Sequence, residues 1–211
     1  MQKKKFIRTF VNIIPTLLFV LVVSLVIFKR DWVQSYDSTI SGFVQSFRTP
    51  LLNHWISLYT QIGNTVPYII ISLIVCLILV WKNYKKEALL LVCNIILGNG
   101  INHLIKQAVQ RHRPELRLIK IDGYSFPSGH SVAAMILFGS LICITFRLFK
   151  NQLSRYLLSL VYLILMLCLG LSRIYLNVHF PTDVTAGFLL GLIVIQVTSH
   201  FFYGRNSKNA R

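Results

Sequence analysis

Long apolar runs, separated by short polar or basic stretches, make up most of the chain. Several of them approach or exceed the roughly 18 apolar residues that a helix needs to cross a bilayer. They predict an all-α, polytopic membrane protein, a bundle of six transmembrane helices. The predicted spans cover residues 10–28, 66–81, 87–105, 128–149, 156–175 and 183–202. The spans leave no room for a soluble domain of typical size, so we expect residues 1–211 to form one membrane-embedded domain.

The stretch from 31 to 65 has a different pattern. Its apolar residues recur at helical spacing and are mixed with polar ones, which predicts short amphipathic helices. Such helices suit the membrane interface, where aromatic side chains act as anchors. The alternative is that they pack over the end of the bundle. The residues concerned are Ile40, Phe43, Val44 and Phe47, then Leu51, Leu52, Trp55, Ile56 and Tyr59.

Two helix faces stand out within the predicted spans. In the third span, Asn99, Asn102, His103 and Lys106 fall at spacings of three and four and therefore share one face. A polar stripe on a membrane helix should point into the bundle and away from lipid. In the sixth span, Gly187 and Gly191 form a GxxxG face suited to close helix packing.

Composition supports a membrane protein: 55% of the residues are hydrophobic and 13% are charged. The net charge is +16 with only six acids. Because the bases lie mostly between apolar runs, we assign them to orientation and to anionic lipid headgroups, and we expect no nucleic-acid partner. The four cysteines lie inside apolar runs without a CxxC pair, so we expect small buried hydrophobes.

The distribution of bases also predicts an orientation. With six spans both termini lie on one side, and the termini with their adjoining loops carry thirteen Lys and Arg residues against nine on the other side. This excess predicts cytoplasmic termini in a multi-pass protein of the cell membrane. Most of the nine opposing bases lie between Lys106 and Lys120, on the side that should carry few. That exception suggests that the loop binds an anion.

Three polar stretches lie at span ends on this outer side. The first is Lys106 followed, six residues later, by Arg113-Pro114. The second is Pro127-Ser128-Gly129-His130, and the third is Ser172-Arg173 with His179 and Asp183 following. Ionisable groups near a bilayer are costly, so the default interpretation is a functional site.

These residue types suit a tetrahedral oxyanion. Guanidinium groups of Arg113 and Arg173 match phosphate geometry, and Lys106 adds a point charge. Ser128 and Gly129 open the fourth span, where free backbone N–H groups and the helix dipole favour an anion. Together they predict a phosphate cage without a metal ion.

The two histidines then have separate roles. Asp183 lies four residues after His179, so its carboxylate can accept from one imidazole nitrogen and leave the other free to attack phosphorus. His130, one turn into the fourth span, can protonate the leaving alkoxide. For each, the alternative is a histidine that only packs at a helix end.

The motifs KX6RP, PSGH and SRX5HX3D, in this order, match the three signatures of the type 2 phosphatidic acid phosphatase superfamily. The chain resembles that family from Lys106 to Asp183, and the first hundred residues carry none of its motifs. The resemblance implies that Lys106, Arg113 and Arg173 bind phosphate, helped by Ser128 and Gly129. It also implies that His179 is the nucleophile, Asp183 orients it, and His130 is the general acid.

The sequence therefore predicts an integral membrane lipid phosphatase that needs neither metal nor cofactor and acts at the outer face of the bilayer. By resemblance, candidate substrates are undecaprenyl diphosphate, phosphatidylglycerophosphate and phosphatidic acid. The alternatives are a lipid phosphotransferase with the same residues and a non-catalytic lipid-binding or lipid-flipping protein on the same scaffold. Arg111, Arg117 and Lys120 either hold a second phosphate or headgroup or are solvated loop charges.

Overall fold

The computed structural model describes residues 2–204, with side chains from residue 13 onward, and this part of the chain is helical throughout, with connecting loops. Short connections join most of the helices, and the longest one, residues 110–128, lies between α5 and α6. The helices are α1 (Gln2–Phe28), α2 (Arg30–Gln45), α3 (Pro50–Tyr59), the short η1 (Thr60–Gly63), α4 (Thr65–Trp81), α5 (Lys85–Val109), α6 (Gly129–Ala134), the π-helical turn η2 (Met135–Gly139), α7 (Ser140–Leu148), α8 (Gln152–Tyr175) and α9 (Pro181–Tyr203).

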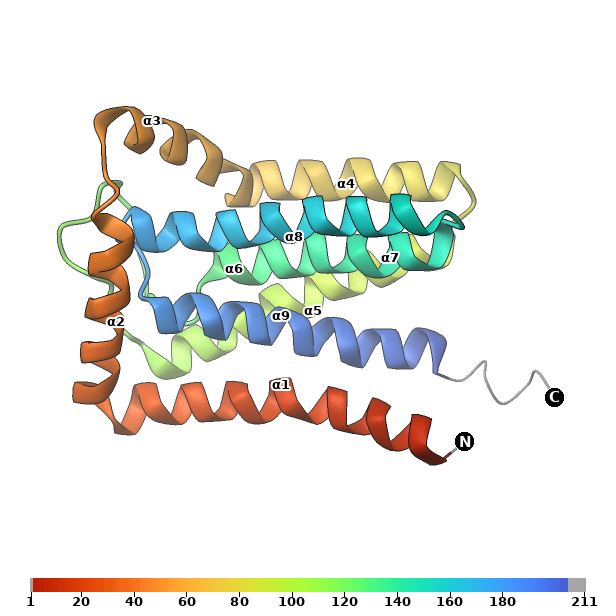
Figure 1. The fold of residues 1–211 in the computed structure, drawn as a ribbon, viewed down its shortest axis with the longest axis horizontal. Helices are drawn as coiled ribbons and strands as arrows, with labels where there is room; N and C mark the ends of the chain where they lie inside the picture. The colour runs from red at the N-terminus through yellow and green to blue at the C-terminus, as the bar shows by residue number, and fades with distance from the viewer. Residues whose placement is uncertain (1, 205–211) are drawn as a thin grey trace.

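The long helices lie side by side in one bundle, and α6, η2 and α7 run on from one another as a single rod (Figure 1). The helix α9 packs against α1, α5 and α6 and is therefore central to the bundle. At one end of the bundle lie α2, α3 and the 110–128 loop, whereas α1 begins and α9 ends at the other (Figure 1). The two ends of the molecule are thus built differently.

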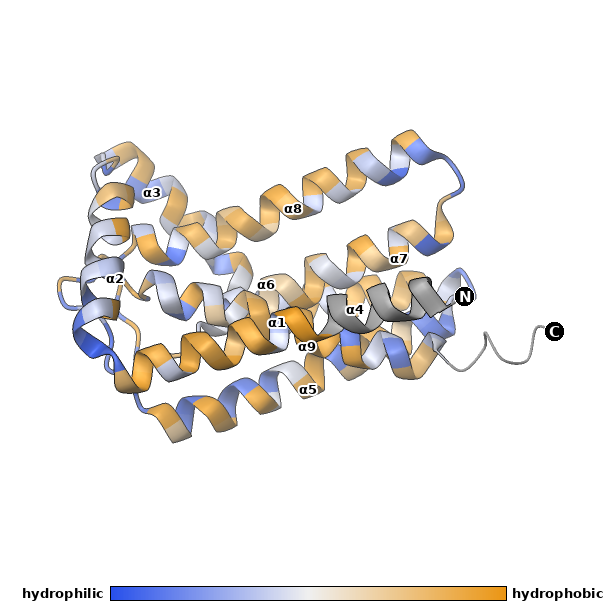
Figure 2. Ribbon diagram, turned by 60° about the horizontal axis from the view of Figure 1, so that its bottom comes forward, coloured by the Kyte–Doolittle hydropathy of each residue, from blue (hydrophilic) through white to orange (hydrophobic). Residues whose placement is uncertain are grey.

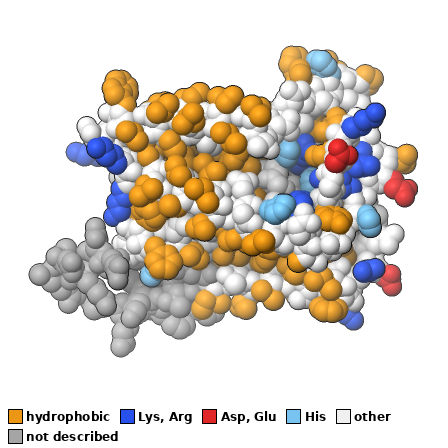
Figure 3. Space-filling model, turned by 180° about the vertical axis from the view of Figure 1, so that it is seen from behind, with side chains coloured by type: hydrophobic (Ala, Val, Ile, Leu, Met, Phe, Trp, Pro, Cys, Tyr) orange, Lys and Arg blue, Asp and Glu red, His pale blue; other side chains and the backbone are white. Residues whose placement is uncertain are grey.

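The prediction of an all-helical, multi-pass membrane protein is confirmed. Within the described residues, four stretches are long and apolar enough to cross a membrane, namely α5, the rod from Gly129 to Leu148, α8 and α9. The number rises to six if each of two bent helix pairs, α1 with α2 and α3–η1 with α4, counts as one span. Polar residues gather in α2, the loops beside it and the opposite helix ends (Figure 2), and a belt of apolar side chains covers the bundle between two charged ends (Figure 3).

Residues 30–59 form the two short helices that their periodicity predicts. The helix α2 turns by 108° from α1 and lies across the bundle end, where it packs on α8 and α9 and buries Val33 and Asp37. It is therefore a packing helix, as in the alternative considered above, although its aromatic residues Trp32 and Phe43 stay exposed. The helix α3 buries none of its residues, which suits the interfacial helix predicted there.

Close packing at the glycine face of α9 is confirmed. A Cβ atom on Gly187 would lie 2.7 Å from the carbonyl oxygen of Ser128, and one on Gly191 would lie 2.7 Å from Met135 Cβ. Only glycine permits this approach of α9 to α6 and η2. The contact sets the start of α6 directly beside the first turns of α9.

Two predictions about burial were only partly right. Asn102 is buried and Lys106 half-buried, but Asn99 and His103 are exposed. The bundle covers only one edge of the predicted polar stripe, because at 3.6 residues per turn Asn102 and Lys106 lie to one side of the stripe and Asn99 and His103 to the other. Cys168 is likewise exposed, and the other three cysteines are half-buried and free.

Candidate active site

The end of α8 presents Arg173 and His179 to the same side of the bundle. Asn177 adopts a left-handed conformation, with φ of 55°, directly after the last helical residues. Its N–H donates to the carbonyl of Ile174 at 3.0 Å, and that of Val178 donates to Arg173 at 3.1 Å. This is the Schellman pattern of helix termination, and asparagine tolerates the left-handed position better than most residues. The chain folds back over the last turn, which places His179 close to Arg173.

Residues from α2 and α3 hold this turn in place. The side chain of Gln45 donates to Asn177 Oδ1 at 3.0 Å, and Arg48 Nε donates to the carbonyl of Tyr175 at 3.0 Å. The hydroxyl of Tyr175 donates to Asn53 Oδ1 at 2.7 Å. The turn of the third motif therefore depends on a segment that carries no motif.

The start of α9 fixes the carboxylate of Asp183. Pro181 begins the helix, and Asp183 Oδ2 accepts the backbone N–H of Phe180 at 2.9 Å. The same oxygen lies 3.4 Å from Nδ1 of His179. Arg113 Nη1, which can only donate, lies 3.1 Å from His179 Nε2. Nδ1 must therefore carry the proton, and the lone pair of Nε2 points away from Asp183 toward the arginine.

His179 is 2% exposed and lies between α8 and α9. Burial lowers its pKa to about 4, although the hydrogen bond to Asp183 acts in the opposite direction. The imidazole is therefore neutral at physiological pH, the form that a nucleophile requires.

The start of α6 carries the second motif. Ser128 is its N-cap, and its Oγ accepts from the backbone N–H of Ser131 at 3.4 Å. The N–H of Ser128 donates to the carbonyl of Asp183 at 3.0 Å, which ties α6 to the first turn of α9. A Cβ on Gly129 would meet only Asn102 Nδ2, at 3.6 Å, so the helix start is loosely packed on the side that this Cβ would face.

His130 is held from the other side by η1 and α4. Its Nε2 lies 3.1 Å from Oδ1 of Asn64, and a Cβ on Gly63 would lie 2.5 Å from the imidazole. His130 is close enough to Arg173, His179 and Arg113 to interact with their charges. The two histidines and two of the arginines therefore share one site.

Arg173 is 1% exposed, and its guanidinium is only partly satisfied. Nη1 donates to Thr60 Oγ1 at 2.6 Å. Nε and Nη2 are buried and have no hydrogen-bond partner among the residues that the structure describes. Buried donors without a partner are costly, so an anion that accepts from both of them is the simplest explanation.

Lys106 and Arg113 reach the site in different ways. Arg113 donates from Nη1 to His179, to the carbonyl of Val178 at 2.9 Å, and from Nε to that of Gly123 at 2.9 Å. Lys106 Nζ donates to the carbonyls of Tyr124, Ser125 and Pro127 at 2.7, 3.4 and 3.0 Å. With these bonds the ammonium of Lys106 holds the loop before α6, and its direct contact with phosphate stays a prediction.

Sequence reasoning missed four residues that support the site: Thr60, Asn64, Asp37 and Arg111. Arg111 was considered for a second phosphate or a solvated charge, but it forms ion pairs of 2.7 Å with both Asp37 and Asp183. Asp37 is 1% exposed on a helix without a motif. An acid in the middle of an amphipathic helix was the available signal, since burial of a carboxylate requires a partner.

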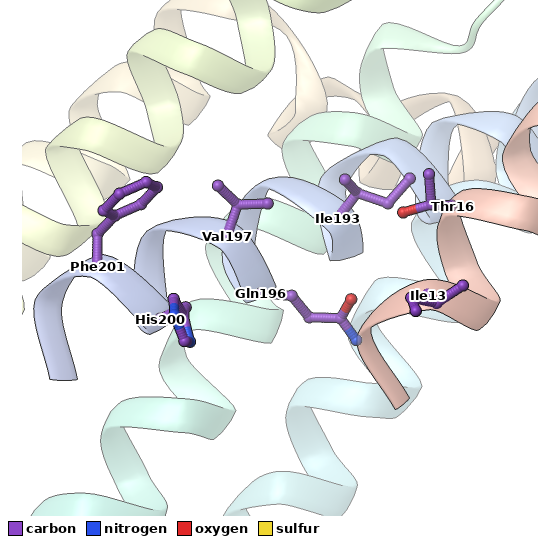
Figure 4. Close-up of a pocket in the computed structure, with 7 residues that line it drawn as sticks. All are labelled: Ile13, Thr16, Ile193, Gln196, Val197, His200 and Phe201. Atoms are coloured by element: carbon purple, nitrogen blue, oxygen red, sulfur yellow. The ribbon is translucent and has the colours of Figure 1, made fainter. Parts of the chain in front are cut away.

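A groove of about 320 Å³ lies elsewhere, between α1 and α9 (Figure 4). His200 is in the last turn of α9 and Asp183 is in the first, so the groove is at the other end of that helix from the motif residues. It is lined by Ile13, Thr16, Ile193, Gln196, Val197, His200 and Phe201.

Taken together, these residues place two arginines beside a neutral, oriented histidine and a second histidine. Within residues 13–204, no group of three or more His, Cys, Asp or Glu side chains could hold a metal ion. A membrane-embedded helical bundle with this site defines a class, the integral membrane phosphatases.

The comparison with protein families shows to which family of this class the protein belongs. The PAP2 superfamily model matches residues 87–207, more than half of the chain, and the protein belongs to that superfamily. It is a lipid phosphate phosphatase of the PAP2 family.

Individual relatives agree with this assignment. Phosphatidylglycerophosphatase B of Bacillus subtilis is 31% identical over 80% of this chain and 84% of its own length. The undecaprenyl-diphosphatase of Sulfolobus acidocaldarius is 28% identical over 56% of each chain. The crystal structure of a transmembrane PAP2-type phosphatidylglycerolphosphate phosphatase from Bacillus subtilis superimposes with a TM-score of 0.80, at 25% identity, over 95% of this chain and 97% of that one.

Proposed function

We propose that this phosphatase acts through a phosphohistidine formed on His179. Nε2 attacks the phosphorus atom of the lipid phosphate, and the bond from phosphorus to the leaving oxygen breaks as His130 donates a proton to that oxygen. Water then attacks the phosphohistidine and gives its proton to His130, which releases inorganic phosphate. Asp183 holds the proton on Nδ1 in both steps, as the 3.4 Å contact allows.

The observation that carries this proposal is the pair of unpartnered donors on buried Arg173. A phosphoryl group in front of Nε2 would accept from them and from the helix start at Ser128 and Gly129. It would also draw Arg113 away from Nε2, which it contacts in the free protein. Binding of the substrate would thus free the nucleophile. Lys106 completes the proposed cage, either by holding the loop before α6 in place or by contacting the phosphate directly.

As substrate we propose phosphatidylglycerophosphate first, with undecaprenyl diphosphate and phosphatidic acid as the other candidates. The similarity to a phosphatidylglycerophosphatase over four fifths of this chain supports that order. The loop from residue 115 to residue 126 is only twelve residues long, which suits a lipid that enters sideways from the bilayer. We further propose one membrane-embedded domain over residues 1–211, with cytoplasmic termini and the site at the outer face.

The decisive experiment measures phosphate release from the three lipids by the protein purified in detergent, with and without EDTA. We expect activity that EDTA leaves intact, that vanadate inhibits as a phosphate mimic, and that His179→Ala abolishes. His54→Ala is the matched control, because His54 lies on α3 without a role in the motifs. Full activity of His179→Ala, or loss of activity in EDTA, would overturn the proposed mechanism.

A further inference from the structure

The carboxylate of Asp37 lies outside the three motifs and accepts three hydrogen bonds. Its Oδ1 accepts the backbone N–H of Thr182 at 2.9 Å, and its Oδ2 accepts Thr182 Oγ1 at 2.8 Å and Arg111 Nη2 at 2.7 Å. Asp37 lies on α2, far in the sequence from its partners, and is 1% exposed. Its bonds end on residues next to the proposed nucleophile and its aspartate.

Arg111 connects this carboxylate to Asp183. Nη1 donates to Asp183 Oδ1 at 2.7 Å and to Thr182 Oγ1 at 2.7 Å, while Nη2 is held by Asp37. The guanidinium also lies over the ring of Phe180, 4.0 Å from its centroid. A planar guanidinium that bridges two carboxylates and stacks on a ring has little freedom to turn.

We propose that Asp37 is a positioning residue of the phosphatase site, which acts through Arg111 to orient Asp183 and hence the imidazole of His179. This inference rests on the proposed role of His179. Asp37 engages one arm of Arg111, so that only the other arm bonds Asp183, at Oδ1. Oδ2 of Asp183 is then left for Phe180 N–H and His179 Nδ1.

Loss of the Asp37 charge would release that arm. The guanidinium would turn both arms toward Asp183, because a paired fork on one carboxylate is its preferred geometry. Oδ2 would be drawn away from Nδ1, whose 3.4 Å contact is already long. The histidine would lose its fixed tautomer and orientation, while the phosphate cage of Arg173, Arg113 and the α6 helix start would stay intact.

A purely structural role makes a different prediction. If Asp37 only fastened α2 to the bundle, its loss would lower stability and leave the turnover of the folded protein unchanged. The distinction requires kcat and KM to be measured per folded molecule, with the thermal midpoint recorded alongside.

The test compares Asp37→Asn and Arg111→Lys with Asp31→Asn, an exposed acid on the same helix α2. For Asp37→Asn we expect kcat to fall about tenfold or more, the loss that one charged hydrogen bond can cause, with KM changed less than about twofold. Competitive inhibition by inorganic phosphate should keep its constant. Asp31→Asn should match the unmodified protein, and Asp37→Glu should recover part of kcat.

A double variant shows whether the effect passes through Arg111. In an Arg111→Lys background, Asp37→Asn should add no further loss in kcat, because the bridge is already broken. Unchanged kcat in folded Asp37→Asn, or fully additive losses, would overturn the proposal. If Asp37→Asn does not fold, full kcat in Arg111→Lys overturns it instead. Activity in His179→Ala would contradict the proposed function itself, so the two failures are distinguishable.

Discussion

At the scale of single residues, the site depends on which polar atoms are satisfied within the protein and which are not. Asp183 has partners on both oxygens, so it is fixed before any substrate arrives. Arg173 is as deeply buried, yet two of its nitrogens lack a partner within the described chain. A buried donor left unsatisfied in this way calls for an explanation, such as an ion that binds there. The contrast separates a residue that orients from a residue that binds.

The first prediction concerns the shape of the cation at position 173. Arg173→Lys keeps the positive charge but loses the planar fork, so we expect kcat/KM to fall about 100-fold or more, since two charged hydrogen bonds to phosphate are lost. Phosphate release from a dispersed lipid substrate measures the change. Arg155→Lys, at the start of the same helix α8, should have no effect. Near-normal kcat/KM in Arg173→Lys would remove this residue from the cage.

The second prediction is a pH dependence. Burial lowers the pKa of His179 to about 4, and only the neutral imidazole can attack phosphorus. Because the pKa is lowered, protonation of His179 in the free enzyme begins only as the pH falls toward 4, so the acid limb of kcat/KM should lie near that value. The second ionisation of the phosphate monoester, near pH 6, gives its own inflection. That inflection should differ between two substrates, whereas the limb near pH 4 should be common to both. A common limb near 6.5, the usual imidazole value, would contradict a buried nucleophile.

At the scale of elements, the site is built where helix ends meet. The terminating turn of α8 supplies Arg173 and His179, the first turn of α9 supplies Asp183, and the capped start of α6 supplies Ser128 to His130. The hydrogen bond from Ser128 N–H to the carbonyl of Asp183 joins two of these ends. Helix ends suit this purpose because their free backbone groups and side chains are presented together.

The third prediction tests the contact between α6 and α9. A Cβ at position 187 would lie 2.7 Å from both the carbonyl oxygen of Ser128 and Ser131 Cβ, and backbone cannot yield cheaply. Gly187→Ala should therefore cost about 1–3 kcal/mol of stability through overpacking and also lower activity, since Ser128 would shift. Gly100→Ala, on α5 with nothing within 4 Å, is the control and should be neutral or slightly stabilising. The thermal midpoint in detergent measures both, and equal midpoints would show that α9 has room to move.

At the scale of the whole molecule, the two ends of the bundle differ. The end that holds the motif residues is covered by α2 and α3, while α1 begins and α9 ends at the other end (Figure 1). The apolar belt between them provides the surface that lipid would contact (Figure 3). In the proposed mechanism, the lipid substrate enters at the end of the bundle that holds the motif residues.

The fourth prediction assigns those ends to the two sides of the membrane. In a variant without the four native cysteines, a cysteine at Leu116, which is 91% exposed beside the site, should react with an impermeant maleimide in intact cells. A cysteine at Lys150, in the connection between α7 and α8, should react only after the membrane is opened. The reverse pattern would place the site at the cytoplasmic face of the membrane and would contradict the orientation inferred from the basic residues.

The sequence by itself determined the helical membrane fold and the phosphatase superfamily to which the chain belongs. Apolar runs of membrane-spanning length leave a chain few alternatives to helices, and the spacing of His179 and Asp183 along the chain already allows their contact. The sequence did not reveal that Asp37 and Arg111 belong to the site, that Asn64 and Thr60 hold His130 and Arg173, or that Lys106 bonds the loop before α6. These contacts join residues far apart along the chain, and the direction in which a side chain points depends on the neighbours that the folded bundle brings to it. Only the tertiary structure decided them, because the cost of burying a charge is known only when its partners are in place.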